Sequence, residues 1–222
     1  MFDLITIHQL IDSVISILDA RDPYTYEHSE RVAYFSERIA IKMNLDSRSI
    51  ALIHFAAHLH DIGKVGVPDY VLNKQGKLTN EEYNLMKSHP RIGYNIVKNI
   101  EVIKEISPLI LYHHERWDGN GYPEGLKGND IPLGARIIAL VDSFDAMTST
   151  RTYKNKMTVD EAFDELQRVS GTQLSPEVVD CFFSMRDEVE NMLSDVNKKM
   201  NHYVFNDTEK ARFNRSQILP VV

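Results

Sequence analysis

The chain of 222 residues has one cysteine, Cys181, and that scarcity excludes several kinds of protein. A single thiol cannot form an internal disulfide, and no pair of cysteines has the spacing of a structural zinc site. Secreted domains held by disulfides and zinc fingers are therefore excluded. The start at Met1 also lacks a basic segment followed by the apolar core of a signal peptide. We expect a reducing, cytoplasmic setting.

Long apolar runs are absent too. Charged or polar residues interrupt every candidate, including the segment from Asp3 to Leu18, so no stretch reaches the ~18 residues needed to span a bilayer. Basic residues are not in excess, because 25 Lys and Arg stand against 32 Asp and Glu, for a net charge of -7. Long nucleic acid requires a sustained Lys/Arg surface. The sequence predicts neither membrane insertion nor binding of long nucleic acid, and it leaves room for a small anionic ligand.

The sequence also lacks a strand pattern of useful length, an internal repeat and a low-complexity segment. Apolar residues recur instead at helical spacing, which predicts an all-α bundle, and a hydrophobic content of 43% is enough for one core. We expect helices over residues 3–19, 50–62, 79–89, 107–114 and 133–148, and others opened by Asp22-Pro23, by Thr158 and by Ser175-Pro176.

What the chain does have is a set of imidazoles and carboxylates without thiolates. Seven candidate metal ligands stand out: His28, His60, Asp61, His89, His113, His114 and Asp142. The expected helices place His28 on an inward face, the His60-Asp61 pair in a last helical turn and His89 at a helix boundary. Such ligands suit divalent iron, manganese or zinc, and the general order of metal affinities does not choose among them.

The remaining histidines receive an ordinary structural interpretation. His54 and His58 are four residues apart and imitate a metal pair, whereas His8 and His202 are isolated. A lone His-Asp dipeptide is by itself a weak signal of metal binding. Asp145 shares a helix face with Asp142 and is expected either to support a ligand or to cap the helix.

Two longer motifs carry a family resemblance. The first is His60-Asp61-Ile62-Gly63-Lys64 with Gly66 and Pro68, and the second is His113-His114-Glu115-Arg116-Trp117-Asp118-Gly119 followed by Gly121-Tyr122-Pro123. Other matching elements stand around them in order: Asp22-Pro23-Tyr24-Thr25, His28-Ser29, Leu78-Thr79, His89-Pro90, Ile131-Pro132-Leu133, Asp142 and Gly171-Thr172-Gln173. Over roughly residues 20–190 the chain thereby resembles the HD-GYP domain family.

The resemblance implies an all-helical phosphodiesterase that hydrolyses cyclic di-GMP to pGpG, in some relatives on to GMP, in bacterial second-messenger signalling. It implies two divalent metal ions, iron or manganese before zinc. One metal would be held by His28, His60, Asp61 and Asp142, and the other by Asp61, His89, His113 and His114. Asp61 would bridge the pair, and a metal-bound hydroxide would attack phosphorus in line without a protein nucleophile.

The resemblance also assigns contacts to the substrate. Lys64 would reach the scissile phosphate or the departing oxygen and would share the catalytic role with Asp61. Gly121 and Tyr122 would line the guanine side. Two further basic residues would approach a phosphate or base of the ligand: Arg151 and Lys154.

Two positions depart from the common family pattern. Glu27 precedes His28 where glycine is frequent, and Tyr24 stands where some members carry a glutamate that accompanies a third metal. Glu27 points about 100° away from His28 around a helix, so it is poorly placed to replace that glutamate. The sequence therefore favours a dinuclear centre.

By resemblance, the chain divides into an N-terminal connector or dimerisation helix over residues 1–20, an HD-GYP domain over 21–193, and a C-terminal extension over 194–222 without a clear pattern. The implied partners are cyclic di-GMP, a second copy through the first helix, and a GGDEF-type or receiver-domain protein. Two alternatives stay open. One is a weakly active or inactive module that binds the nucleotide or a GGDEF-type partner; the other is a phosphohydrolase of another cyclic dinucleotide, such as cyclic GMP-AMP.

Overall fold

The structure, a computed structural model, describes residues 4–19, 21, 25–149, 156–198 and 200. Over these residues it contains helices and no strand, which confirms the predicted all-α class. The elements in chain order are α1 (Leu4–Asp19), α2 (Thr25–Lys42), α3 (Ser47–Leu59), η1 (Ile62–Gly66), α4 (Asp69–Leu72), α5 (Asn80–Met86), α6 (His89–Val97), η2 (Lys104–Ile106), α7 (Ser107–Tyr112), η3 (Gly128–Asp130), α8 (Leu133–Thr148), α9 (Val159–Val169) and α10 (Pro176–Phe183), followed by a helical segment over residues 186–198.

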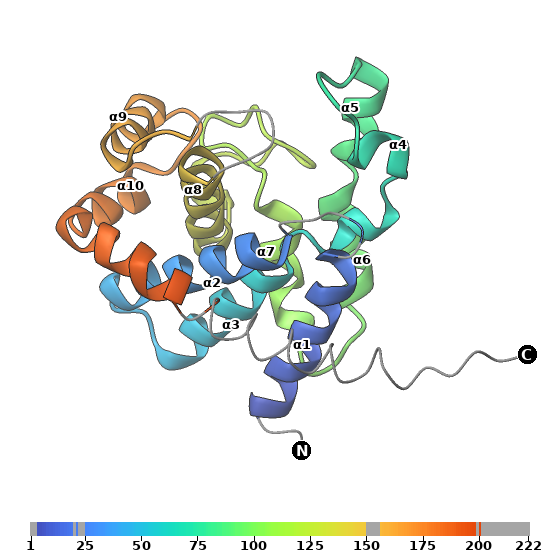
Figure 1. The fold of residues 1–222 in the computed structure, drawn as a ribbon, viewed down its shortest axis with the longest axis horizontal. Coiled ribbons are helices and arrows are strands. Elements are labelled where there is room, and N and C mark those ends of the chain that lie inside the picture. Colours follow the sequence, from blue (N-terminus) through green and yellow to red (C-terminus); the bar gives the residue numbers. More distant parts are fainter. Residues whose placement is uncertain (1–3, 20, 22–24, 150–155, 199, 201–222) are drawn as a thin grey trace, which may run out of the picture.

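Helix α2 is the centre of the bundle and packs against α1, α3, α8 and α10. Helices α9 and α10 lie on one side of it, and α4 and α5 lie on the opposite side of the molecule (Figure 1). Among the described residues, no helix is long and apolar enough to cross a membrane. The arrangement leaves α2, α3, α7 and α8 adjacent. The candidate ligands lie on α2 and α8, directly after α3 and α7, and at the start of α6.

Four buried phenylalanines fix α2 and α8 against the C-terminal helices. The rings of Phe163 and Phe182 are stacked, with centroids 5.0 Å apart and planes at 6°. Phe144 lies 5.1 Å from Phe182 and 5.7 Å from Phe35 between ring centroids. Burying one such side chain contributes roughly 1.5–3 kcal/mol. This cluster holds α8 on α2. The face of α8 that carries Asp142 and Asp145 therefore meets the N-terminal half of α2.

Several helix starts follow the predicted capping chemistry. Thr79 caps α5 and Thr158 caps α9, each in a capping box with the glutamate three residues later. The bounds of α8, Leu133–Thr148, coincide with the predicted ones, and α1 agrees with its prediction over the described residues. The predicted start at Asp22-Pro23 lies outside the described residues.

Three predicted helix ends were wrong. Helix α3 ends at Leu59, so the His60-Asp61 pair lies after the last turn, where the chain turns into η1. Helix α5 ends at Met86 and His89 begins α6, because a proline at the second position of a helix lacks only an N–H that has no helical partner there. Likewise α7 ends at Tyr112, and its two following histidines lie beyond it.

Candidate metal centre

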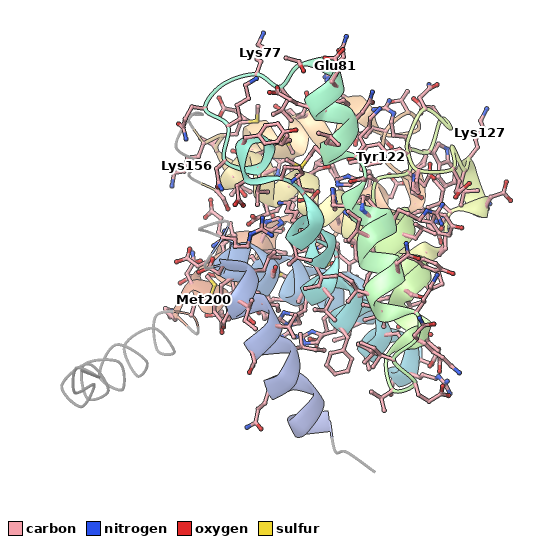
Figure 2. All side chains as sticks on the ribbon, turned by 90° about the vertical axis from the view of Figure 1, so that its right-hand side faces the viewer. Lys77, Glu81, Tyr122, Lys127, Lys156 and Met200 are labelled. Carbon is pink, nitrogen blue, oxygen red and sulfur yellow. The ribbon has the colours of Figure 1, made fainter. Side chains whose placement is uncertain are left out.

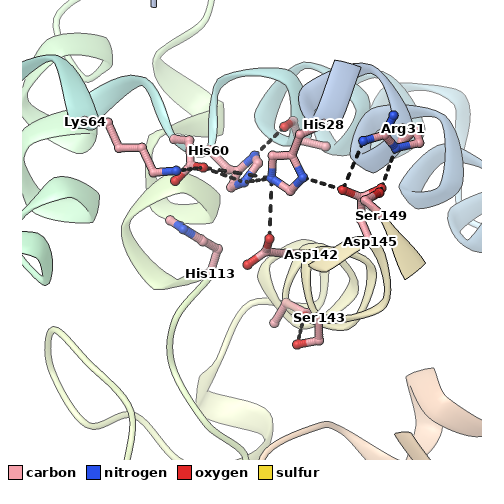
Figure 3. Close-up of polar contacts among 12 residues, drawn as sticks. His28, Arg31, His60, Lys64, His113, Asp142, Ser143, Asp145 and Ser149 are labelled. Carbon is pink, nitrogen blue, oxygen red and sulfur yellow. Dashed lines mark hydrogen bonds and ion pairs between the residues drawn. The ribbon is translucent and has the colours of Figure 1, made fainter. Parts of the chain in front are cut away.

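The seven predicted ligands converge at one place in the bundle, although their elements are far apart in the chain. The structure groups them as two clusters whose ligand atoms lie within 4.8 Å of one another: Asp61, His89, His113 and His114 in one, and His28, His60 and Asp142 in the other. We call His28, His60 and Asp142 the first half-site, and His89, His113 and His114 the second half-site. Figure 3 shows the first half-site between α2 and α8.

Asp61 lies between the two half-sites and presents one oxygen to each. Its Oδ2 is 3.4 Å from Nε2 of His60 and 3.9 Å from Nε2 of His28. Its Oδ1 is 3.3 Å from Nε2 of His89, which in turn is 3.3 Å from Nε2 of His113. A carboxylate in this position can contribute one ligand atom to each of two neighbouring cations.

The first half-site closes through a carboxylate from α8. Nε2 of His28 is 3.3 Å from Nε2 of His60 and 3.4 Å from Oδ1 of Asp142. Three ligand atoms therefore face a common point. They are two imidazole nitrogens and one carboxylate oxygen. The second half-site differs in composition, because all three of its own members are imidazoles.

Three of the histidines are oriented by the main chain. In each case Nδ1 donates to the carbonyl oxygen three residues earlier, at 2.7 Å for His60 and Ala57, 2.8 Å for His89 and Met86, and 2.7 Å for His113 and Ile110. These carbonyls belong to the last turns of α3, α5 and α7 and have no partner inside their helices. A carbonyl can only accept, so Nδ1 carries the proton and Nε2 keeps the lone pair that a metal needs.

Burial keeps the imidazoles of the second half-site neutral. It lowers the pKa of His89, lowers that of His113 well below its ordinary value, and lowers that of His114 to about 4. The neighbouring imidazoles act in the same direction, because two protonated rings repel each other. Near neutral pH these rings are therefore ready to bind a cation without first losing a proton.

Asp61 is ionised although it is buried. Burial by itself would raise the pKa of its carboxyl, but Lys64 and the surrounding histidines outweigh that effect and hold the pKa well below the ordinary range. Nζ of Lys64 lies 2.8 Å from Oδ2 of Asp61. The site thus combines an anionic bridge with a cationic side chain beside it.

His28 is oriented differently from the other histidines. Its Nδ1 lies 2.7 Å from Oδ2 of Asp145, and Nε of Arg31 donates to Oδ1 of the same carboxylate at 2.5 Å (Figure 3). The hydroxyl of Ser149 adds a third hydrogen bond at 2.9 Å. Burial would raise the pKa of Asp145, but His28 and Arg31 together lower it. Asp145 thus contacts a candidate ligand, which agrees with the first of its two predicted roles.

The loop after the second half-site folds back onto it. The main-chain N–H of Tyr122 donates to the carbonyl of His114 at 3.2 Å, and the two rings lie 4.9 Å apart at 30°. Gly121 passes so close to the backbone of Glu115 and Arg116 that a Cβ would lie 2.3–2.7 Å from it. Oε1 of Glu115 accepts from the N–H groups that follow Pro123, those of Glu124 and Gly125.

The centre is mostly buried. His28, His60, Asp61, His89 and His113 are buried, whereas four other groups are partly exposed: Lys64, His114, Tyr122 and Asp142. Figure 2 shows Tyr122 within the body of the molecule, with the exposed Lys127 projecting from its edge. A ligand reaching the centre would meet this partly exposed set first.

The donor set fits divalent cations. It consists of imidazole nitrogens with fixed orientation and carboxylate oxygens, and there is no thiolate among the grouped ligands. Such a mixture suits metals of intermediate softness. The described residues therefore include a cluster that could hold metal, in agreement with the prediction, while the identity of the metal belongs to the proposal below.

Some predicted site residues lie elsewhere. Arg151, Lys154 and Tyr24 fall outside the described residues. Glu27 is exposed and pairs with Arg31 at 3.4 Å, so it does not face the centre. His54 and His58 face glutamates of α2 and join neither metal cluster, which agrees with their ordinary interpretation.

Two functional candidates were missed from the sequence alone. Arg31 was assigned no role, although its position three residues after His28 places it on the same helix face. Glu115 is part of the second motif, but no neighbouring residue in the sequence indicates that its carboxylate accepts hydrogen bonds from Glu124 and Gly125. The first could have been found from helical spacing, and the second only from the folded loop.

Comparison with known proteins places the site in a family context. The family model described as HD domain matches residues 12–178. A cyclic di-GMP phosphodiesterase of Thermotoga maritima is 44% identical over 186 residues, covering 83% of this chain and 50% of the relative. A 3'3'-cGAMP-specific phosphodiesterase of Vibrio cholerae is 37% identical over 188 residues, covering 82% of this chain and 35% of the relative. This chain thus spans about half or less of the length of these relatives.

One solved structure gives the same fold. The crystal structure of a cyclic GMP-AMP specific phosphodiesterase of Vibrio cholerae matches with a TM-score of 0.67 at 21% identity, covering 89% of this chain and 53% of that chain. At this level of identity the match bears on architecture alone. It agrees with the all-helical bundle described above.

Proposed function

This chain belongs to the HD domain family, as its motifs predicted, and we propose that it is a metal-dependent phosphodiesterase that hydrolyses cyclic di-GMP to pGpG, with further cleavage to GMP as a second step. One observation carries the proposal. Asp61 presents its two oxygens to two separate ligand clusters, and the ammonium of Lys64 lies beside it. Paired cation sites with a positive side chain beside them suit the in-line cleavage of a phosphodiester.

We propose that two divalent ions, iron or manganese before zinc, occupy the centre. The residues that would hold them are the two half-sites with Asp61 as the shared ligand. When bound, such ions supply Lewis-acid activation of water and of the phosphoryl oxygens. The departure at Tyr24 favours two ions over three.

The chain's own residues would provide the remaining functions. Lys64 offers a positive charge to the oxygen on which negative charge builds up as the phosphodiester is cleaved. Tyr122, close to the ring of His114, and Gly121 before it would line the base side of the ligand. Arg151 and Lys154, which lie outside the described residues, are proposed to contact a phosphate or base.

A second candidate keeps the reaction and changes the substrate. A relative that is 37% identical is named as a 3'3'-cGAMP-specific phosphodiesterase. The two cyclic dinucleotides share their phosphodiester ring and differ in one base, so the metal centre and Lys64 would serve both equally. Discrimination would therefore depend on the base contacts near Tyr122.

The wider setting is part of the proposal. We place a connector helix at residues 1–20, the HD-GYP domain at 21–193 and an extension at 194–222, in a cytoplasmic protein. Helix α1 exposes Val14 and Ile17, at 39% and 66% of their surfaces, and such a face suits packing against a second copy or a receiver or GGDEF-type partner. Measurement of the mass in solution tests the dimer.

The decisive experiment is product analysis. Protein loaded anaerobically with ferrous iron, or separately with manganese, would be incubated side by side with cyclic di-GMP and 3'3'-cyclic GMP-AMP. We expect metal-dependent formation of linear products from cyclic di-GMP in the wild type and none with Asp61→Asn. The matched control is Asp180→Asn, the same chemical change at an exposed position of α10.

Each result decides between the candidates. Faster turnover of cyclic GMP-AMP would move the assignment to the second substrate. If either nucleotide binds but is not hydrolysed with any metal, the protein would be assigned as a nucleotide-binding module and not as an enzyme. The appearance of GMP after pGpG would show that the second cleavage occurs.

A further inference from the structure

Four histidines of the centre differ in what holds their Nδ1 atoms. His60, His89 and His113 donate from Nδ1 to main-chain carbonyls. His28 has a carboxylate there instead, Asp145, at 2.7 Å. The difference matters because a carboxylate partner makes an imidazole a stronger electron-pair donor than a neutral carbonyl does.

We propose that Arg31 and Asp145 form a positioning pair that orients His28 and makes the first half-site the tighter of the two cation sites. Within the centre described above, the two half-sites then fill in a defined order. The inference deepens the proposed function, since it concerns the same centre. It adds that the two half-sites differ in cation affinity, which the identity of their ligands does not by itself indicate.

The geometry around Asp145 leaves its carboxylate little freedom. Arg31 contacts both oxygens, with Nε 2.5 Å from Oδ1 and Nη2 3.5 Å from Oδ2, and Ser149 donates to Oδ1 at 2.9 Å. The side chains of Arg31 and Asp145 are only 11% and 4% exposed. Oδ2 is therefore held facing Nδ1 of His28, and the ring of His28 is held with Nε2 toward Asp142 and Asp61.

The charge distribution points in the same direction. The first half-site has Asp142 as its own carboxylate and Asp145 immediately behind His28. The second half-site consists of three imidazoles and has only a share of Asp61. A divalent cation is attracted more strongly to the half with more negative charge nearby. Two positive charges reduce that difference: Arg31, which pairs with Asp145, and Lys64, whose Nζ lies 2.8 Å from the Asp61 oxygen that faces the first half-site.

The experiment measures metal binding rather than activity. Protein stripped with a chelator is titrated with manganese, and free manganese is followed by electron paramagnetic resonance. To isolate the first half-site, Asp145→Ala is also made in a His89→Asn background, in which the second half-site is damaged. Removing a carboxylate that supports a metal-bound histidine weakens metal binding typically by about 10–100-fold.

We expect wild type to bind in two steps and His89→Asn to retain the tighter one. Asp145→Ala should weaken that step by about 10–100-fold in both backgrounds. Asp145→Asn should weaken it less, because its amide oxygen still accepts. Arg31→Gln should fall between wild type and Asp145→Ala, because the loss of orientation at Asp145 outweighs the removal of one positive charge. Ser143→Ala is the matched control, because Ser143 lies on the same helix and bonds only within it (Figure 3). If the tight step is unchanged in Asp145→Ala, or if the weak step is lost instead, the inference is wrong.

A second readout covers variants that fold poorly. In wild-type protein labelled with nitrogen-15 histidine, two-dimensional spectra should show a proton on Nδ1 of His28, the atom that faces Asp145, assigned by comparison with His28→Gln. The opposite tautomer would contradict the inference.

Failure of the wild type to hydrolyse cyclic di-GMP would overturn the proposed function and leave these results standing, whereas turnover with unaltered metal binding in Asp145→Ala would overturn this inference alone.

Discussion

Nζ of Lys64 lies 2.8 Å from Oδ2 of Asp61, on the carboxylate that separates the two half-sites. The pair is three residues apart, and the turn into η1 brings the two side chains together. Lys64 is partly exposed and Asp61 is buried, so the ammonium is more accessible to solvent than the bridging carboxylate. A cation here helps to keep Asp61 ionised, and it also repels any metal that Asp61 binds.

Lys64→Gln should therefore separate catalysis from metal binding. We expect turnover of cyclic di-GMP to fall by about 10²–10³-fold, the usual effect of removing one group that stabilises developing charge. Manganese affinity should not fall, because a like charge beside the cations has been removed. Lys127→Gln, at an exposed position, is the control. A parallel loss of metal and activity would show that Lys64 acts by shaping the site.

Gly63 and Gly66 make a matched pair for testing the junction of η1 with α6. A Cβ on Gly63 would lie 1.8 Å from the carbonyl oxygen of His89, which is backbone and cannot yield. A Cβ on Gly66 would meet only the flexible side chain of Ile92, at 2.9 Å. We expect Gly63→Ala to separate Asp61 from His89, abolish the second metal step and destabilise the fold by about 1–3 kcal/mol or more.

Gly66→Ala should keep both metal steps and most of the stability, because the side chain of Ile92 can rotate away. Urea unfolding and manganese titration of the two variants measure these effects. Equal behaviour of Gly63→Ala and Gly66→Ala would mean that the close approach of η1 and α6 does not hold the centre together.

The neutral imidazoles predict an acid-sensitive fold. His114 has a pKa of about 4 in the folded chain, against an ordinary value of 6.5. Between these values the unfolded chain binds more protons than the folded one, so stability falls as the pH falls from about 6.5 to about 4. His89 and His113 are shifted in the same direction and add to the effect.

The measurement is the urea midpoint of chelator-stripped protein at several pH values in that window. The slope of stability against pH should be shallower in His114→Gln, because this variant lacks one imidazole whose pKa is lower in the folded chain than in the unfolded chain. A stability that is flat from about pH 6.5 to about pH 4.5 would contradict the assigned pKa shifts.

Glu115 should matter for substrate binding and not for metal. Its Oε1 accepts two main-chain N–H groups, at 2.7 Å from Glu124 and 3.0 Å from Gly125, and so holds the segment after Tyr122. Hydrogen bonds to a charged group contribute roughly 1.5–3 kcal/mol each. We expect Glu115→Ala to raise KM for cyclic di-GMP and to leave manganese binding unchanged, with Glu115→Gln closer to wild type. A lost metal step in Glu115→Ala would place Glu115 in support of His114 instead.

The sequence predicted element types well and helix ends less well. Capping boxes at Thr79 and Thr158 and the bounds of α8 depend on neighbouring residues, so local patterns sufficed. The ends of α3, α5 and α7 were predicted too late, because each helix stops where a histidine turns its Nδ1 back to a free carbonyl. Helical spacing alone does not show where such a bond replaces the next helical turn.

Two things were determined by the sequence alone: the all-helical class and the set of seven ligand types in order. The class follows from residue chemistry and from spacing along one chain, and the ligand set is predicted from the family resemblance of the motifs. Only the tertiary structure decided that Asp61 divides its oxygens between two clusters and that His28 is held by Asp145 and Arg31. The partners of His28 on α8 are more than one hundred residues away in the chain, and their distances are set by the packing of α8 on α2, which no local pattern contains.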